Sequence, residues 1–324
     1  MTQPAQSTPS SPSPLSFASS PSSPTALSAD AELLARLRRG PLGGRVDSVF
    51  THVINVLASD DELVSLCARG LDDAPWSVRV DVDDWADSGV RAGETVTLTA
   101  DEVTFGAPSR RVALMTHPRE WHSKPVEMRL TGAQLAGRTR VLAELLDAHG
   151  TRGGMRTPPD TANVFEAAVG AELRRGQEAL HRSVLADDVP GLHAAITQLL
   201  GLGTGLTPTG DDFLTGLALL AAQPGSRLPG YVTAARDVLE RLPDRTTRLS
   251  RTTLREALRG RVRQSLLDVL HPLLSPAGPG AAELSRRLRP PVDRVLAIGH
   301  TSGADLLSGL RAGLRLEAEL RGSM

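Results

Sequence analysis

Residues 201–216 combine residue types that could bind a small anion. They read GLGTGLTPTGDDFLTG, in which glycines alternate with other residues, two threonines flank a proline, and two aspartates precede an apolar run. Glycine lets a ligand approach the backbone closely, and the free N–H groups at the start of a helix attract anions. The stretch therefore predicts an anion-binding loop before a helix, with Thr209 as its N-cap and Asp212 at the capping-box position.

A second stretch, residues 299–310, copies this pattern. It reads GHTSGADLLSGL, and its last eight residues align with GDDFLTGL in the first stretch. Ser302 and Asp305 again have capping-box spacing, and a glycine follows each aligned aspartate by four residues, on the same helix face. Because those glycines lack a side chain, the sequence predicts that the two helices can pack closely.

Two interpretations of this repeat differ in function. In one, the stretches are only well-capped helices that pack through glycines. In the other, both helix N-termini converge on one anionic ligand. We favour convergence because each loop has groups that capping does not need, namely Asp211 and three upstream glycines in the first loop and His300 in the second.

Three side chains of these loops are candidates for catalysis. His300 could act as an acid or base, or polarise a carbonyl; its alternative role is structural, through a hydrogen bond to a nearby carbonyl. Asp211 and Asp212 could hold Mg²⁺ against a phosphate, and Mg²⁺ is the only cofactor that these residues suggest. Helix capping is the alternative role of Asp212, which leaves Asp211 as the sharper candidate.

The rest of the chain predicts an α+β fold. Between residues 41 and 125, short β-branched segments alternate with period two and are separated by turn residues, which is typical of strands. From about residue 130 the apolar residues follow the helical period. Strands followed by helices favour α+β over a doubly wound sheet. We expect a β-rich domain over residues 29–128 and a helical domain over residues 129–324 that carries both loops.

The first 28 residues differ in composition from the rest. They include ten serines and six prolines, and such a segment buries too little apolar surface to offset its chain entropy. We therefore predict a disordered tail over residues 1–28. It lacks the basic start and the continuous apolar stretch of a signal peptide.

The overall composition restricts the classes of partner. A chain of 324 residues with 40% apolar residues and a net charge of −1 favours a soluble globular protein that binds neither nucleic acid nor an anionic membrane. No apolar run approaches the roughly 20 residues of a membrane-spanning helix. Cys67 is the only cysteine, which excludes an intrachain disulfide and a cysteine-based metal cluster. The expected location is the cytoplasm.

Both glycine-rich stretches closely resemble a bacterial family that includes the AllH subunit of oxamate carbamoyltransferase. The segments TTRLSRTTLREALRG, at residues 246–260, and RVDSVFTHVINVLAS, at residues 45–59, are also similar to that family, so the resemblance spans most of the chain. The resemblance implies a role in anaerobic allantoin breakdown, in which oxalurate and phosphate give oxamate and carbamoyl phosphate. It also implies two partner chains, and it leaves open which subunit carries the chemistry.

This implied chemistry assigns binding roles to residues of the motifs. Carbamoyl transfer to phosphate needs an anion cradle and donors for the developing oxyanion, and a carboxylate substrate suits an arginine fork such as Arg248 or Arg251. The alternative role of both arginines is a solvated helix charge. The expected substrate-binding residues are Gly203, Gly205, Thr207, Thr209, Gly210, Thr247, Arg248, Ser250, Thr301, Ser302, Gly303 and Asp305.

Three functions follow as hypotheses. The first is a subunit of a carbamoyltransferase-like enzyme that works with partner subunits. The second is a non-catalytic subunit that binds a small anion or acts as a scaffold, and the third is a Mg²⁺-dependent phosphate-handling enzyme. In each case the ligand is a small anion, such as phosphate, carbamoyl phosphate or an oxamate-like molecule.

Overall fold

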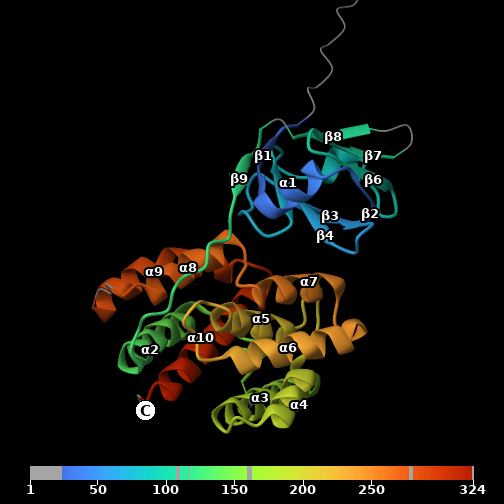
Figure 1. The fold of residues 1–324 in the computed structure, drawn as a ribbon. Helices are drawn as coiled ribbons and strands as arrows, with labels where there is room; N and C mark the ends of the chain where they lie inside the picture. The colour runs from blue at the N-terminus through green and yellow to red at the C-terminus, as the bar shows by residue number, and fades with distance from the viewer. Residues whose placement is uncertain (1–23, 107–109, 116, 159–162, 277–279, 323–324) are drawn as a thin grey trace, which may run out of the picture.

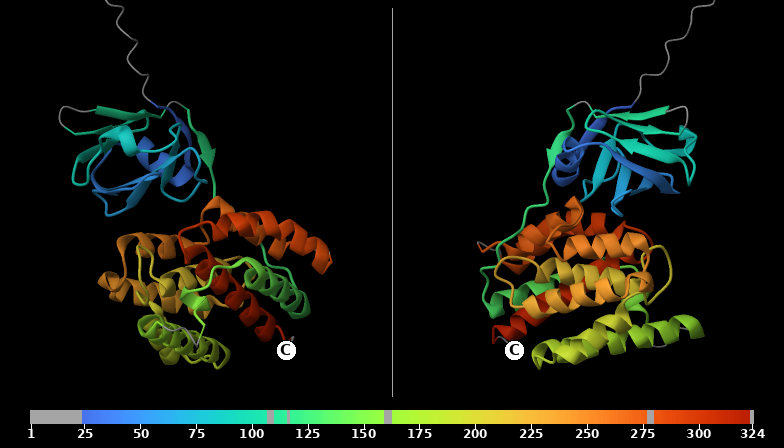
Figure 2. Two further views of the ribbon diagram at one scale, coloured as in Figure 1. Left: turned by 180° about the vertical axis from the view of Figure 1, so that it is seen from behind. Right: turned by 45° about the vertical axis from the view of Figure 1, so that its right-hand side comes forward.

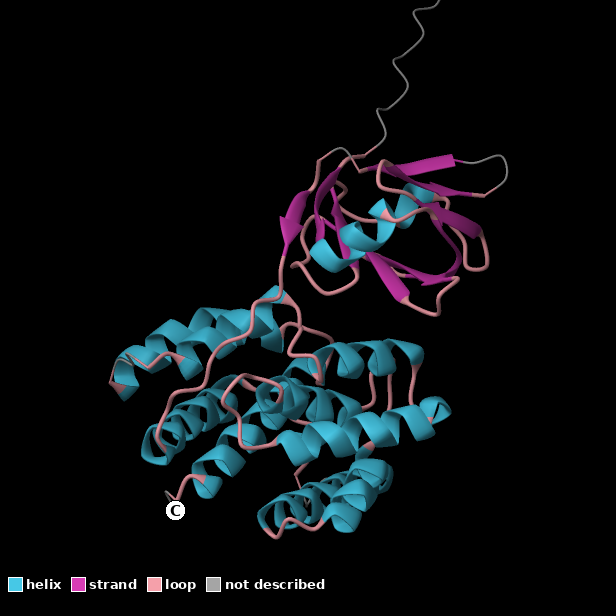
Figure 3. Cartoon of the chain, viewed as in Figure 1, coloured by secondary structure: helices cyan, strands magenta, loops and turns pink. Residues whose placement is uncertain are grey.

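The chain folds into a strand-rich part followed by a helical part, which confirms the predicted α+β class (Figures 1 and 3). The computed structural model describes residues 24–106, 110–115, 117–158, 163–276 and 280–322. Seen from two further sides, the sheet and the helices remain separate, and an extended segment after strand β9 links them (Figure 2). No helix within the described ranges combines the length and apolar character needed to cross a bilayer.

The strand-rich part is one curled sheet. Its strand order is β8-β7-β6-β2-β3-β4-β5-β1-β9, and the neighbours are antiparallel except for β4 with β5 and β1 with β9. The described strands are β1 (Ala26–Asp30), β2 (Leu42–Val49), β3 (Val53–Ala58), β4 (Leu63–Ala68), β5 (Ser77–Val80), β6 (Thr95–Leu98), β7 (Glu102–Phe105), β8 (Arg110–Leu114) and β9 (Arg119–Trp121), with a 3-10 turn, η1, at Ala86–Ser88.

Strand β1 lies partly within the segment that the sequence assigns to a disordered tail. Ala26–Asp30 pairs with β5 on one side and with β9 on the other, so these residues form part of the sheet. The sequence did not indicate this strand, because it begins inside the Ser/Pro-rich segment and only its last two residues lie beyond that segment. The remainder of the predicted tail, residues 1–23, lies outside the described residues.

The two faces of the sheet have different roles. One face packs with helix α1 (Ala31–Arg38) into an apolar core that includes Ile54, Val56, Val64 and Leu66. The alternation of strand side chains sends the intervening residues of β3 and β4 to the opposite face. That face is turned toward the helical part and contributes one wall of the cavity described below.

The helical part is built around two central helices, α5 and α10. Every residue of α5 is buried. The described helices are α2 (Gly132–His149), α3 (Val164–Leu185), α4 (Val189–Leu199), α5 (Thr209–Ala221), α6 (Pro229–Arg241), α7 (Arg248–Ala257), α8 (Gln264–Leu274), α9 (Ala281–Leu296) and α10 (Ser302–Leu320), with 3-10 turns η2 (Gly154–Arg156) and η3 (Pro243–Arg245).

Helices α5 and α10 cross at the two glycines of the copied pattern. A Cβ at Gly216 would overlap the carbonyl oxygen of Leu306, and a Cβ at Gly309 would overlap that of Phe213. Phe213 and Leu306 occupy the same position in the two copies, so the crossing is nearly symmetric. The predicted close packing through glycine is therefore present.

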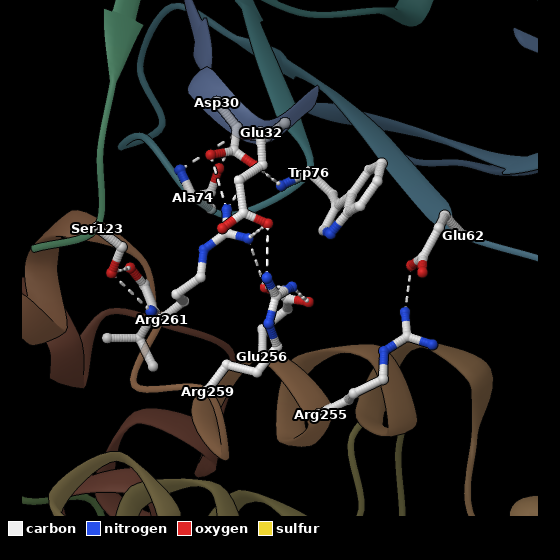
Figure 4. A network of polar contacts seen from close by, with 12 residues as sticks. Asp30, Glu32, Glu62, Ala74, Trp76, Ser123, Arg255, Glu256, Arg259 and Arg261 are labelled. Atoms are coloured by element: carbon white, nitrogen blue, oxygen red, sulfur yellow. Dashed lines mark hydrogen bonds and ion pairs between the residues drawn. The ribbon is translucent and has the colours of Figure 1, made fainter. Parts of the chain in front are cut away.

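The apolar pattern of residues 253–274 does not form one helix. It divides into α7 and α8 at Gly260, whose φ of +77° is a left-handed conformation that ends α7. Arg261 then turns toward the sheet. Its Nη2 lies 2.7 Å from a carboxylate oxygen of Asp30, and it also pairs with Glu32 and Glu256 (Figure 4). This buried ion network joins the sheet to the helices.

Candidate functional site

The two copied stretches meet in space. The Thr207 hydroxyl oxygen, from the loop before α5, lies 2.9 Å from the Ser302 hydroxyl oxygen at the start of α10. Thr207 also donates a hydrogen bond of 3.0 Å to Asp212. The helices thus pack through glycine and their N-termini lie together; an anionic ligand at that point stays a prediction.

The glycines that begin the two helices occupy matching positions. A Cβ at Gly210 would overlap the carbonyl oxygen of Leu199, and a Cβ at Gly303 would overlap that of Val295. Each helix start is thus pressed against the end of the preceding helix. Neither Gly210 nor Gly303 lines the cavity described below, so the structure places both in packing contacts.

The predicted helix caps are wrong at both loops. Pro208 is the N-cap of α5, and its carbonyl accepts the amide hydrogens of Asp211 and Asp212. The proline's fixed φ places this carbonyl at the helix start, so Thr209 becomes the first helical residue. Thr301, rather than Ser302, caps α10 without a side-chain capping bond. The hydroxyls and carboxylates of both loops are consequently free for other contacts.

A cavity of about 990 Å³ opens at the junction of the two loops. The outer face of the sheet forms its opposite wall, and residues 152–154 with 157 and 158 form one side. We call this space the loop cavity. The predicted site residues that line it are Gly203, Gly205, Thr207, Thr209, Asp212, His300, Thr301 and Ser302.

Residues 203–207 and 299–302 line one side of this space. The amides of residues 203–207 donate no hydrogen bond to any described residue, and neither do those of residues 299–302. Gly203 and Gly205 have φ values of +122° and +101°, which glycine adopts without the strain that other residues incur. The first loop thus exposes its backbone toward the loop cavity.

Asp212 is the carboxyl group of α5 that lines the loop cavity. Burial raises the pKa of Asp212 to about 8; bonds from Ser302 and Thr207 oppose this rise, whereas the nearby carboxyls of Asp305 and Asp211 add to it. At neutral pH the protonated form is therefore favoured. A protonated carboxyl in a cavity can donate a proton to a reacting group.

Asp305, the counterpart of Asp212 in the second copy, is closed off from the cavity. It is fully buried, and its Oδ1 accepts a hydrogen bond of 2.8 Å from the Met155 amide. Gly154 packs directly against the same carboxylate. Burial raises the pKa of Asp305 to about 6, against the opposing effects of the Met155 amide and of the Thr301 and Thr209 hydroxyls.

Both carboxylate oxygens of Asp211 accept hydrogen bonds from neighbouring loop segments. Its Oδ1 accepts a hydrogen bond of 2.7 Å from the Gly201 amide, and its other oxygen accepts one from Thr246. Asp211 is buried and does not line the loop cavity. It ties the start of the glycine loop to the segment before α7. His300, by contrast, is exposed on the cavity wall and has no hydrogen-bond or ion-pair partner among the described residues.

The segment TTRLS lies beside the glycine loop, but its arginines point elsewhere. Thr247 caps α7 and donates a hydrogen bond of 2.8 Å to the carbonyl of Leu206. Arg248 pairs with Asp47 on strand β2 at 2.7 Å, and Ser250 is buried. Arg251 pairs with Asp61, also in the strand-rich part. None of these four residues lines the loop cavity; from this segment the apolar Leu249 does.

Arg152 is a basic residue of the cavity wall that the motifs did not indicate. Arg152 lines the loop cavity and precedes Gly153 and Gly154, whose φ values are +113° and +55°. The Gly-Gly pair after an arginine was the available signal. It was missed because nothing in the sequence shows that residues 152–154 fold against the start of α10.

The predicted Mg²⁺ ligands do not form a cluster. Asp211 faces Gly201 and Thr246, whereas Asp212 faces Thr207. Within the part of the chain that the structure describes, no group of three or more His, Cys, Asp or Glu side chains is arranged to hold a metal ion.

Comparison with known families matches both parts of the chain. A family model described as oxamate carbamoyltransferase subunit AllH matches residues 199–314, which include both copied loops. A second model, described as the AllH family N-terminal domain, matches residues 25–119. No solved structure matches the chain. The two matches together cover more than half of the sequence.

Proposed function

Because the chain belongs to the AllH family, we propose that it is a subunit of a carbamoyltransferase-like enzyme of allantoin catabolism, located in the cytoplasm and acting with partner subunits. Its substrates in this proposal are oxalurate or oxamate and carbamoyl phosphate. The supporting observation is the meeting of the two copied loops at one cavity, where Thr207 and Ser302 are 2.9 Å apart.

The reaction needs groups that this arrangement supplies. A phosphate oxygen attacks the carbamoyl carbon of oxalurate. The bond from that carbon to the nitrogen that links it to the oxalyl group then breaks. That nitrogen takes a proton, so that carbamoyl phosphate forms and oxamate leaves. Free amides of residues 203–207 and 299–302 would bind phosphate and the developing oxyanion. Asp212 or His300 would supply the proton. In this scheme Asp211 shapes the first loop through its bonds to Gly201 and Thr246.

The alternative is a non-catalytic subunit that binds a small anion or acts as a scaffold. The observation that favours it is the use of Asp211 and Asp305 in internal hydrogen bonds, which is what a purely structural role would require. The anion-binding surface is the same in both proposals. They differ in whether Asp212 and His300 take part in proton transfer.

Ligand binding and activity can be tested separately. Ligands that bind the native state raise the apparent melting temperature, so we would measure thermal shifts of the full chain with phosphate, carbamoyl phosphate, oxamate and oxalurate, with and without Mg²⁺. Carbamoyl phosphate consumption would then be assayed with the partner subunits present. His300→Ala and Asp212→Asn are the test variants, and His149→Ala, an exposed histidine outside the cavity, is the control.

We expect at least one anion to raise the melting temperature of the full chain. We expect turnover to be lost in both test variants and kept in the control. Binding without any effect of either variant on turnover would favour the scaffold. If no anion binds the chain, alone or in the assembly, the anion site is excluded.

A further inference from the structure

The loop cavity contains four basic side chains, of which two are engaged. Arg261 pairs with Asp30 and Glu256, and Arg263 pairs with Asp72. Arg152 and His300 have no ion-pair or hydrogen-bond partner among the described residues. Within the part of the chain that the structure describes, Arg152 is therefore the guanidinium of this cavity that has no ion-pair partner.

The backbone holds Arg152 next to the second copied loop. A Cβ at Gly153 would contact the Thr301 methyl group at 3.2 Å, and Gly154 packs against the Asp305 carboxylate. The Met155 amide is bonded to that same carboxylate. Three successive residues after Arg152 are thus fixed against the start of α10, which anchors the base of an otherwise free side chain.

We propose that Arg152 binds the anionic group of the substrate in the loop cavity, with its guanidinium paired to carboxylate or phosphate oxygens. This inference rests on the proposed function and adds the residue that selects the charge of the ligand. It replaces Arg248 and Arg251, which the sequence suggested for this role and which pair with Asp47 and Asp61 instead.

The chemistry of guanidinium makes the proposal specific. Its planar fork can donate two parallel hydrogen bonds to a carboxylate or to two phosphate oxygens, which an ammonium group cannot do. One cavity residue of opposite charge offers a matched control. Glu166 is exposed at the cavity wall, and its removal eliminates a negative charge from the same space. Loss of Arg152 should therefore weaken anion binding, whereas loss of Glu166 should not.

Calorimetric titration of the full chain tests this assignment. The probes are oxamate and inorganic phosphate, and the variants are Arg152→Ala, Arg152→Lys and Glu166→Gln. We expect Kd for the bound anion to rise about 10- to 100-fold in Arg152→Ala, the loss typical of a charge-assisted hydrogen-bond pair. Arg152→Lys should recover only part of the lost affinity. Glu166→Gln should bind the anion as tightly as the parent or more tightly. Since Arg152 pairs with none of the described residues, melting temperatures without ligand should stay unchanged.

The two probes identify the source of the anionic group. A larger loss for oxamate assigns Arg152 to the carboxylate, and a larger loss for phosphate assigns it to the phosphoryl group; either result supports the proposal. Anion binding by Arg152→Ala with the parent's Kd would overturn it while leaving the proposed function intact. If the parent chain binds neither probe, alone or with its partners, the proposed function itself fails. In the assembled enzyme, Arg152→Ala should raise KM for that substrate more than it lowers kcat.

Discussion

The two copied loops share a backbone plan but differ in what their side chains do. Gly210 and Gly216 in the first copy have the same packing roles as Gly303 and Gly309 in the second. The aligned carboxyls differ, because Asp212 lines the loop cavity whereas Asp305 is covered by residues 154 and 155. The repeat thus provides two helix starts of one shape, and neighbouring segments decide which aligned carboxyl faces the loop cavity.

A second difference concerns the residue after the first glycine of each aligned pattern. The first copy has Asp211 there, and the second has Ala304, which is buried. Asp211 holds Gly201 and Thr246, so it stabilises the long glycine loop that only the first copy has. The second copy is short and carries His300 at its exposed edge instead. The first loop is therefore the longer wall of the loop cavity, and the second adds a shorter wall that carries His300.

The largest expected effect is loss of the symmetric helix crossing. Gly216→Ala and Gly309→Ala each place a methyl group onto a carbonyl oxygen of the facing helix and near its backbone nitrogen, at 2.9 Å. We expect each to lower the free energy of unfolding by about 3 kcal/mol or more, with similar values for the two sites. Urea denaturation measures this. Gly137→Ala in α2, where nothing lies within 4 Å, is the control and should be neutral or slightly stabilising.

A clear difference between Gly216→Ala and Gly309→Ala in the loss of unfolding free energy would contradict the comparison. It would show that one helix can shift at the crossing to accommodate the methyl group and that the other cannot, so that the two copies are not equivalent in packing.

The two aligned carboxyls should give different pH windows of stability. The pKa of Asp212 is raised from 3.8 to about 8, and that of Asp305 to about 6. Between the ordinary and the raised pKa, the folded state binds more protons than the unfolded state, so stability falls as pH rises through each window. Asp212→Asn should remove this loss between about pH 4 and 8, and Asp305→Asn between about pH 4 and 6.

The size of the effect should reach a few kcal/mol at the upper end of each window, since one pKa unit corresponds to about 1.4 kcal/mol. Denaturation at a series of pH values measures it, with the exposed Asp244→Asn as control. Parallel stability profiles for Asp212→Asn and the parent between pH 4 and 8 would contradict the buried, protonated state of Asp212.

Asp211 should matter to stability although it does not reach the cavity. Asp211→Ala leaves the Gly201 amide and the Thr246 hydroxyl without their acceptor. The cost should be about 2 kcal/mol, the typical penalty for an unpaired buried group, and Asp211→Asn should recover part of it by keeping one acceptor oxygen. Chemical denaturation gives both values. An unchanged stability in Asp211→Ala would return Asp211 to the list of functional candidates.

The sequence predicted those features that depend on local pattern. The strand period before residue 125, the helical period after it and the repeat at residues 303–310 are short-range signals, and each has its counterpart in the structure. The features that it missed depend on distant partners. Gly260 ends α7 where Arg261 must reach Asp30. Within residues 281–296, two prolines obscure the helical pattern of α9.

The same limit applies to the candidate site. The spacing of the motif identified the loops but predicted the wrong N-caps. Pro208, rather than Thr209, is the N-cap of α5, and its carbonyl accepts the first helical amides. The role of Arg152 was invisible, since it depends on residues 153–155 folding onto α10, far along the chain. Arg248 looked suitable only while its partner on β2 was unknown. Tertiary contacts therefore decide which side chains of a recognised motif are free.

The smallest expected effect concerns the hydroxyl pair of Thr207 and Ser302, one of the contacts between the two loops. Thr207 bonds to Asp212 and lies 2.9 Å from the Ser302 hydroxyl, so Thr207→Val and Ser302→Ala should each destabilise the protein by about 1 kcal/mol. A double-mutant cycle isolates their coupling, which we expect to be about 0.5–1 kcal/mol. Additive single effects would mean that the hydroxyl pair itself does not hold the loops together. A measurable coupling would show that the hydroxyl pair itself links the two copies, so that a ligand displacing it must replace those hydrogen bonds.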